Sequence, residues 1–189
     1  MKPLSLNKLV FVALLSTMTL TACEDKSVVK EEAESISVMT TEERAQKIAK
    51  ETIIIDTHID VPYRLEEKYE DVSKATIKGD FDYPRAIKGG LDAPFMSIYI
   101  PSKLQKTGGS KALADKLIDD VEAIVKQSPN KFALAYSTSQ VKENFTKGII
   151  SLPMGMENGS AIEGDLANLH HFYNRGIRYI TLAHAKTNH

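Results

Sequence analysis

The sequence predicts an α/β fold built on a parallel sheet, and three observations support this prediction. Short apolar segments rich in β-branched residues alternate with segments in which apolar residues recur at helical spacing. The apolar segments are continuous, as expected for strands that helices cover on both faces. Polar side chains able to bind a metal follow several of these segments. The pattern leaves two architectures open: an open α/β sheet, or a (β/α)8 TIM-type barrel truncated after about five strands.

The chain begins with the features of a bacterial lipoprotein signal peptide. Lys2 and Lys8 accompany an apolar run over residues 9–20, which is short for a membrane span but suits a secretion signal. The segment LTAC at 20–23 resembles the bacterial lipobox, in which cleavage precedes a cysteine that receives diacylglycerol. We therefore predict a signal peptide over residues 1–22 and lipidation of Cys23, the only cysteine. The alternative is an uncleaved anchor helix with an incidental cysteine.

This signal implies export and a lipid anchor on a bacterial membrane, with the folded domain facing the periplasm or the cell exterior. Glu24 directly follows the cysteine, which favours the outer membrane in enterobacterial lipoproteins. Residues 23–39 are mostly charged or polar and predict a flexible tether. The folded domain is expected over residues 40–189.

The elements of this domain follow from local patterns. Thr40 and Glu43 have the spacing of a capping box, which predicts a helix over residues 41–51. Continuous apolar runs predict strands, the first of which ends in a loop that carries a histidine and an aspartate; the runs comprise residues 52–55, 93–100, 131–136, 149–156 and 177–183. Apolar residues at helical spacing predict a helix over 109–127, with Leu113, Leu117, Val121 and Ile124 on one face. A short helix over 139–147 is expected to end at Gly148. A last helix carries the stripe Ile162, Leu166, Leu169 and Tyr173 before Gly176.

Composition excludes two classes of protein. The chain is 42% hydrophobic and 26% charged, which is ordinary for a globular protein and unlike a disordered one. Its formal net charge is -1, and no basic cluster is present. Nucleic acid is therefore not an expected partner.

Four side chains at predicted strand ends could carry chemistry, because such ends converge on one face of a barrel. His58 and Asp60 are two residues apart in an extended segment, so both point to one side and could bind zinc or a similar ion. Glu157 lies between Gly155 and Gly159, which would let the backbone approach a ligand. His184 follows the fifth strand. The alternatives are a structural His–Asp pair, a solvated glutamate and a structural histidine.

Four segments in this order resemble the membrane (renal) dipeptidase family, a branch of the amidohydrolase-like barrels. They are IDTHIDVP at 55–62, GGLDAPFMS at 89–97, GMENGSAI at 155–162 and RGIRYITLAH at 175–184. The resemblance covers nearly everything from Glu51 to the end. It implies an incomplete metal-dependent hydrolase barrel of the amidohydrolase-like kind.

The resemblance also implies a site. His58 and Asp60 would bind one ion of a binuclear zinc pair, and Glu157 would bridge both ions as a catalytic ligand. His184 would contact the substrate or the tetrahedral intermediate. Dipeptides are the implied substrates, often with a D-residue at the carboxyl end. The reaction would be hydrolysis by metal-activated water.

The family uses two further histidines and a late aspartate, to which no residue of this chain corresponds. His189, His170 and His171 do not match those positions, and the last two are expected to be exposed on a helix. The chain by itself is therefore predicted to bind metal weakly and to be inactive. Two other functions stay open: an amidohydrolase-like hydrolase of another amide or ester, and a non-catalytic lipoprotein binding module. The sequence also leaves a homodimer open.

Overall fold

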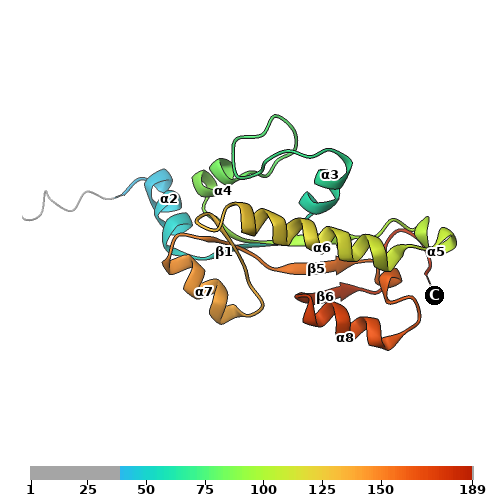
Figure 1. Ribbon diagram of the computed structural model, residues 1–189. Helices are drawn as coiled ribbons and strands as arrows, with labels where there is room; N and C mark the ends of the chain where they lie inside the picture. Colours follow the sequence, from blue (N-terminus) through green and yellow to red (C-terminus); the bar gives the residue numbers. More distant parts are fainter. Residues whose placement is uncertain (1–38, 189) are drawn as a thin grey trace, which may run out of the picture. The chain divides into compact units, whose positions relative to one another are not determined.

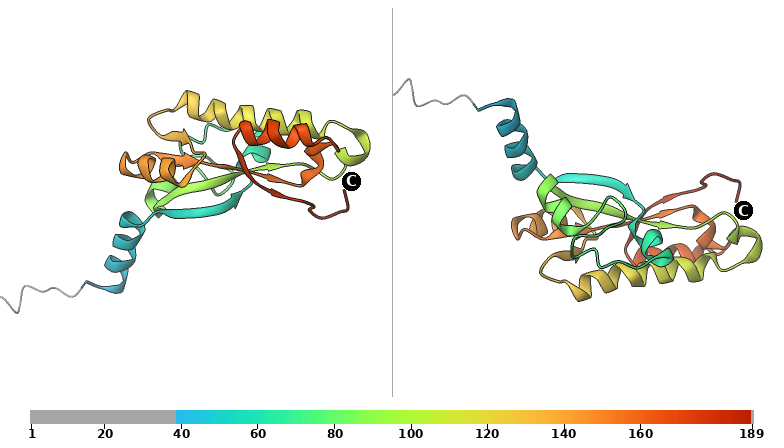
Figure 2. Two further views of the ribbon diagram at one scale, coloured as in Figure 1. Left: turned by 90° about the horizontal axis from the view of Figure 1, so that it is seen from below. Right: turned by 90° about the horizontal axis from the view of Figure 1, so that it is seen from above.

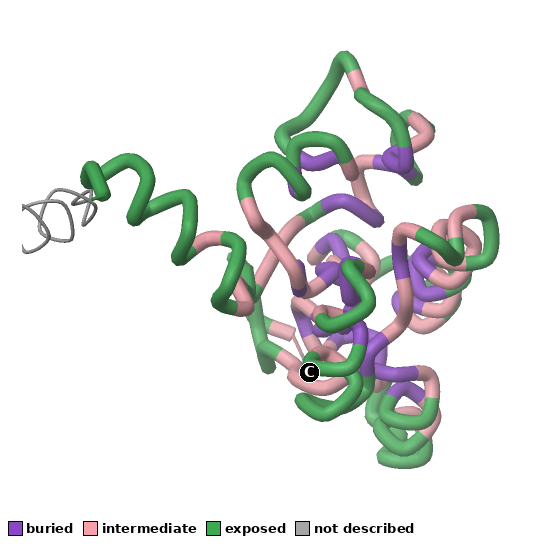
Figure 3. The backbone as a smooth tube through the Cα atoms, turned by 90° about the vertical axis from the view of Figure 1, so that its left-hand side faces the viewer, coloured by how far each residue is buried: buried purple, intermediate pink, exposed green. Residues whose placement is uncertain are grey.

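The computed structural model describes residues 39–188 (Figure 1). The predicted signal peptide, Cys23 and the tether up to residue 38 lie outside these residues and stay predictions. The described part begins with helix α2 (Thr41–Glu51), whose predicted capping box is confirmed. The Glu43 amide donates to the Thr40 hydroxyl at 3.2 Å, and the Thr40 amide donates to the Glu43 carboxylate at 2.8 Å. Figure 3 shows α2 exposed along nearly its whole length, and none of its residues is buried.

The predicted parallel sheet is confirmed. Four strands form one sheet in the order β1-β2-β5-β6, and all neighbours in it are parallel; their bounds are β1 (Ile54–Ile59), β2 (Leu91–Tyr99), β5 (Met154–Glu157) and β6 (Ile177–Thr181). A separate parallel pair joins β3 (Phe132–Leu134) to β4 (Ile150–Leu152). The predicted fourth strand is thus divided at Pro153. Proline has no amide proton for a ladder, although the Pro153 carbonyl accepts from the Met96 amide at 2.8 Å.

The four-stranded sheet is strongly curved. Its edge strands β1 and β6 are three strand spacings apart, which would be about 14 Å in a flat sheet. The Tyr179 hydroxyl on β6 nevertheless lies 2.9 Å from the Thr57 carbonyl oxygen on β1. A tyrosine side chain bridges these strands only if the sheet curls around it. This is the curvature of a barrel wall.

Helices cover one side of this wall. Figure 2 shows α6 and α8 on the same side of the sheet. The helices are α3 (Val61–Glu67), α4 (Tyr83–Gly89), α5 (Leu104–Thr107), α6 (Ser110–Gln127), α7 (Thr138–Thr146) and α8 (Leu166–Asn174), with a 3₁₀ turn η1 (Gly159–Ile162). The core between sheet and helices includes Met96, Ile98, Leu117, Phe132, Met156 and Phe172. None of the helices within residues 39–188 is long and apolar enough to cross a membrane.

Several predicted boundaries need correction. β1 runs to Ile59, so His58 lies inside a strand and not in the loop after it. The helices α3 and α4 were not predicted, although Asp82 before a proline at the start of α4 is a typical cap signal. In α8 the predicted stripe is wrong: Phe172 is buried, whereas Leu166 and Tyr173 are 72% and 60% exposed.

Asp82 anchors the connection between α3 and β2. It is buried, and its carboxylate accepts hydrogen bonds from the Arg85 and Thr76 amides, both at 2.9 Å, and from Arg85 Nε at 2.9 Å. Burial alone would raise the pKa of Asp82, but the bonds from Arg85 and Thr76 outweigh it and hold the pKa well below its usual value. The carboxylate therefore stabilises the fold in its ionised form.

We expect Asp82→Asn to lower the free energy of unfolding at pH 7 by about 2 kcal/mol, because charged hydrogen bonds are lost. The pKa is lower in the folded state, so the stabilisation is complete above the unfolded value of about 3.9 and disappears as the pH falls through the folded value. Urea unfolding between pH 7 and pH 2 should therefore show a smaller decline for the variant than for the wild type. Asp80→Asn, at an exposed neighbouring carboxylate, is the control. Parallel declines in the wild type and D82N would contradict this account.

Candidate metal centre

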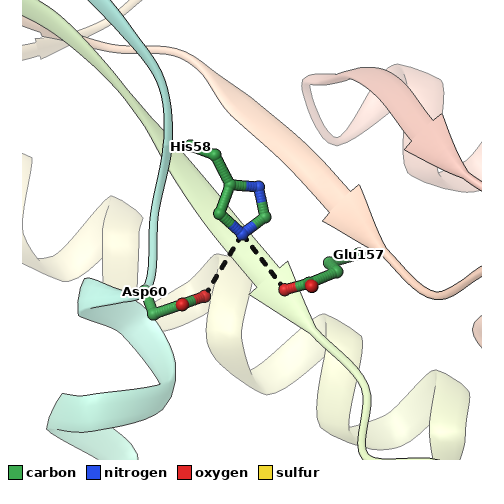
Figure 4. Close-up of side chains that lie close together, drawn as sticks. All are labelled: His58, Asp60 and Glu157. Carbon is green, nitrogen blue, oxygen red and sulfur yellow. Dashed lines mark hydrogen bonds and ion pairs between the residues drawn. The ribbon is translucent and has the colours of Figure 1, made fainter. Parts of the chain in front are cut away.

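Three of the predicted residues meet at the carboxyl end of the sheet (Figure 4). His58 extends from β1, Asp60 directly precedes α3 without a capping hydrogen bond from its side chain, and Glu157 is the last residue of β5. His58 Nε2 lies 3.4 Å from Asp60 Oδ1 and 3.1 Å from Glu157 Oε2. One ligand atom from each residue lies within 4.8 Å of the other two. The structure therefore brings together side chains that are far apart in the sequence.

This donor set fits a divalent cation. An imidazole nitrogen and two carboxylate oxygens are ligands that zinc accepts. Bonds of about 2.0–2.1 Å in a tetrahedral shell place neighbouring ligand atoms roughly 3.3 Å apart. The two separations from His58 Nε2, 3.1 and 3.4 Å, lie close to this value. Little rearrangement would be needed to place an ion among the three side chains.

Glu157 is a mostly buried carboxylate whose charge is not neutralised by a lysine or arginine among the described residues. Its side chain is 13% exposed, and within residues 39–188 no lysine or arginine forms an ion pair with it. Oε2 accepts from the Ser97 hydroxyl at 3.2 Å and faces His58, whereas Oε1 lies 2.9 Å from His184 Nε2. A mostly buried carboxylate without a strong cation is costly unless an ion compensates it. The two Glu157 oxygens thus contact two different histidines.

His184 contacts Oε1 of Glu157, the oxygen other than the one nearest to His58. It follows β6 and its side chain is 45% exposed. Its ring contacts Tyr99 edge-on at a centroid distance of 5.4 Å, and Tyr99 contacts Tyr63 in the same way at 5.1 Å. Burial, together with the charge of Glu157, raises the pKa of Tyr99, so its hydroxyl stays protonated. The accessible face of His184 could therefore meet a ligand beside the carboxylate.

Asn158 holds the end of β5 in place. Its φ of 76° is in the left-handed region, which asparagine tolerates better than most residues. Its side-chain amide donates to the Ile100 carbonyl at 2.8 Å, and its backbone amide donates to the Thr181 hydroxyl at 2.9 Å. Its side-chain oxygen accepts from the Ser160 hydroxyl at 2.7 Å. These bonds join the ends of three strands directly beside Glu157.

The glycines around Glu157 have a different role from the predicted one. Neither Gly155 nor Gly159 has a positive φ. A Cβ atom at Gly155 would lie 2.0 Å from Cζ of Tyr179, and one at Gly159 would lie 3.2 Å from the Leu182 carbonyl oxygen. Both glycines therefore make room for β6 and the residues after it.

The sequence interpretation missed three residues of the site: Ser97, Tyr99 and Tyr179. A usable signal existed for Ser97, since it is a serine inside the otherwise apolar stretch FMSI at residues 95–98. Tyr99 lies two residues further along β2, on the same face. Of the two helix histidines, His170 is exposed as predicted. His171 instead lies 2.6 Å from Asp115 and is only partly exposed. Neither contributes to the site.

Comparisons with known proteins identify relatives of this chain. The family model described as membrane dipeptidase (peptidase family M19) matches residues 42–189. An uncharacterized dipeptidase of Schizosaccharomyces pombe is 31% identical over 78% of this chain and 40% of its own length. The dipeptidase AtaJ of Aspergillus terreus is 29% identical over 77% of this chain and 38% of its own length. The chain thus spans about two fifths of the curated relatives it matches.

Solved structures share the fold. A probable dipeptidase of Pseudomonas aeruginosa superimposes with a TM-score of 0.69 at 21% identity, covering 77% of this chain and 38% of that one. A metallopeptidase of Rhodobacter sphaeroides, solved with a phosphinate mimic of the dipeptide L-Ala-D-Ala, has a TM-score of 0.63 at 22% identity, covering 72% of this chain and 46% of that one. These likenesses agree with the predicted TIM-type, amidohydrolase-like fold. With the family match over residues 42–189, they lead to one conclusion: the chain belongs to the membrane dipeptidase family, peptidase family M19.

Proposed function

We propose that the protein containing this chain hydrolyses dipeptides with water activated by two zinc ions. The observation that carries the proposal is the position of Glu157, which joins the His58–Asp60 pair on one side and His184 on the other. The dipeptide mimic bound to the R. sphaeroides metallopeptidase supports this class of substrate, including a D-residue at the carboxyl end.

In this proposal His58 and Asp60 would hold one ion, and Glu157 would be a ligand shared by both ions. Bound zinc would lower the pKa of its water and polarise the scissile carbonyl. Glu157 keeps its position because Ser97 donates to Oε2 and Asn158 fixes the strand end behind it. His184, whose Nε2 lies next to Glu157, would be the donor to the oxygen on which negative charge develops.

A dipeptidase assay with and without zinc tests the function. The full-length protein should hydrolyse dipeptides such as L-Ala-D-Ala, lose activity with a chelator, and regain it with zinc. The 189-residue chain alone should be inactive, because it offers three ligands and lacks counterparts of the later histidines and aspartate that the family resemblance implies. Dipeptide hydrolysis by the 189-residue chain alone would refute the conclusion that its three ligands are too few for activity. A zinc-loaded full-length protein that cleaves other amides or esters, and no dipeptide, would refute the substrate class.

A further inference from the structure

The Tyr179 side chain crosses the inner face of the sheet from β6 to β1. Its hydroxyl donates to the Thr57 carbonyl oxygen at 2.9 Å and lies 3.0 Å from His58 Nδ1. Its ring packs against Phe95 on β2, with a centroid distance of 5.5 Å. Tyr179 therefore contacts the nitrogen of His58 that faces away from Asp60 and Glu157.

The neighbouring strand leaves space for this crossing. β5 and β6 pair at Met154 with Ile177 and at Met156 with Ile180, and Gly155 lies between these pairs. A Cβ atom there would lie 2.0 Å from Cζ and 2.2 Å from Cε1 of Tyr179, which no side chain at Gly155 could avoid. The Tyr179 ring occupies this space, so its path to His58 depends on glycine at position 155.

The hydrogen bonds fix where the proton of the imidazole lies. The Thr57 carbonyl can only accept, so the single proton of the Tyr179 hydroxyl is used there. The hydroxyl then has only lone pairs for His58, and Nδ1 must carry a proton in order to donate to it. In the neutral ring, the free lone pair is therefore on Nε2, the atom that faces Asp60 and Glu157.

We infer that Tyr179 is a positioning residue of the metal centre: it orients the His58 ring and keeps Nε2 as the nitrogen that binds the ion, in a space that Gly155 provides. The inference rests on the proposed metal-dependent function. Groups that hold a metal-binding histidine through its second nitrogen typically contribute 10- to 100-fold to metal affinity. Here a hydroxyl connects that nitrogen to a backbone carbonyl, so loss of the hydroxyl leaves the ring free to turn.

The first test compares zinc affinities by competition with a chromogenic chelator. In the full-length protein, Tyr179→Phe keeps the ring in place and removes the hydroxyl, and it should weaken zinc binding by about 10- to 100-fold. The matched control is Tyr173→Phe, at a tyrosine on α8 that is 60% exposed, which should leave the affinity unchanged. If the wild type binds zinc and Y179F binds it equally well, the inference fails and the metal centre stands. If the wild type binds no zinc, both fail.

A second measurement separates positioning from simple packing. In the zinc-loaded wild type labelled with 15N-histidine, the His58 Nδ1 proton should give a downfield, slowly exchanging NMR signal, which Y179F should lack. A pure packing role would lower the melting temperature of Y179F and leave both this signal and the zinc affinity unchanged.

Gly155→Ala should reproduce the loss of the signal by displacing the Tyr179 ring. Gly89→Ala, where a Cβ atom would meet nothing within 4 Å, should not. Persistence of the signal in folded Y179F would overturn the inference.

Discussion

In the full-length protein, Glu157→Gln should abolish zinc-dependent dipeptide hydrolysis, with a loss in kcat/KM of roughly a thousandfold or more, because in the proposed mechanism Glu157 is the ligand shared by both ions that activate the water. An amide has one oxygen and no charge, so it cannot give an anionic oxygen to each of two ions. The carboxylate it replaces has its oxygens directed to His58 at 3.1 Å and to His184 at 2.9 Å. Assays at saturating zinc, together with zinc stoichiometry, measure both losses.

The same substitution should change stability in opposite directions with and without metal. In the metal-free protein, glutamine removes a mostly buried charge that has no lysine or arginine partner among the described residues, so we expect a gain of about 1 kcal/mol. In the wild type, zinc at 100 times its dissociation constant should add roughly 2.7 kcal/mol, and E157Q should lose most of this. Thermal melts with zinc and with chelator give both values.

Glu143→Gln is the matched control, because Glu143 lies on α7 with a side chain that is 62% exposed. It should change neither activity nor the zinc-dependent rise in melting temperature. An E157Q protein that keeps normal zinc stoichiometry, and is less stable than the wild type in chelator, would show that Glu157 serves the fold and not an ion.

The sequence predicted the sheet well because its central strands β2 and β5 are mostly buried and therefore read as continuous apolar runs. The edge strands β1 and β6 are less buried than predicted, because helices cover only one side of the sheet. The sequence interpretation placed the end of β1 too early. The strand continues through His58 because Asp56 and Ile59 pair with Pro94 and Met96 on β2, and this pairing is not visible in the local pattern. The break at Pro153 could have been predicted, since proline interrupts a ladder.

The error in α8 has a different cause. Periodicity identifies an apolar helix face but does not say what packs on it. Leu166, Leu169 and Tyr173 line an open depression of about 620 Å³ together with residues of β6, while the core contact comes from Phe172. The sequence therefore predicted that α8 has an apolar face, but it did not predict which residues of the helix are buried.

The metal-binding candidates could be predicted because the carboxyl ends of parallel strands lie at the same edge of the sheet, and in a barrel they converge on one face. Tyr179 could not be predicted in this way. Its contact with His58 requires β6 to curl back towards β1 and requires an empty position at Gly155. Both conditions are properties of the assembled sheet and not of any segment.

In the full-length protein, His184→Asn should lower kcat by about 100- to 1,000-fold and leave zinc stoichiometry and affinity unchanged. The reason is its position: the His184 side chain is 45% exposed, and its Nε2 lies 2.9 Å from Oε1 of Glu157. A group there can donate to the oxyanion of the intermediate without holding an ion itself. The asparagine side chain is shorter than that of histidine, so its amide does not reach the position of His184 Nε2 beside Tyr99. The transition state then loses a hydrogen bond that the ground state does not need.

His170→Asn, at an exposed histidine on α8, is the control and should keep full activity. The decisive comparison is between H184N and E157Q under the same zinc titration. If His184 acts on the substrate, H184N binds zinc like the wild type and hydrolyses dipeptides slowly. E157Q, in contrast, loses both normal zinc binding and activity. If H184N instead loses one ion per protein, His184 is a ligand of the second ion, since its Nε2 lies only 2.9 Å from Glu157 Oε1. The assignment of His184 to the substrate would then be wrong, and the binuclear centre would extend further towards β6 than we propose.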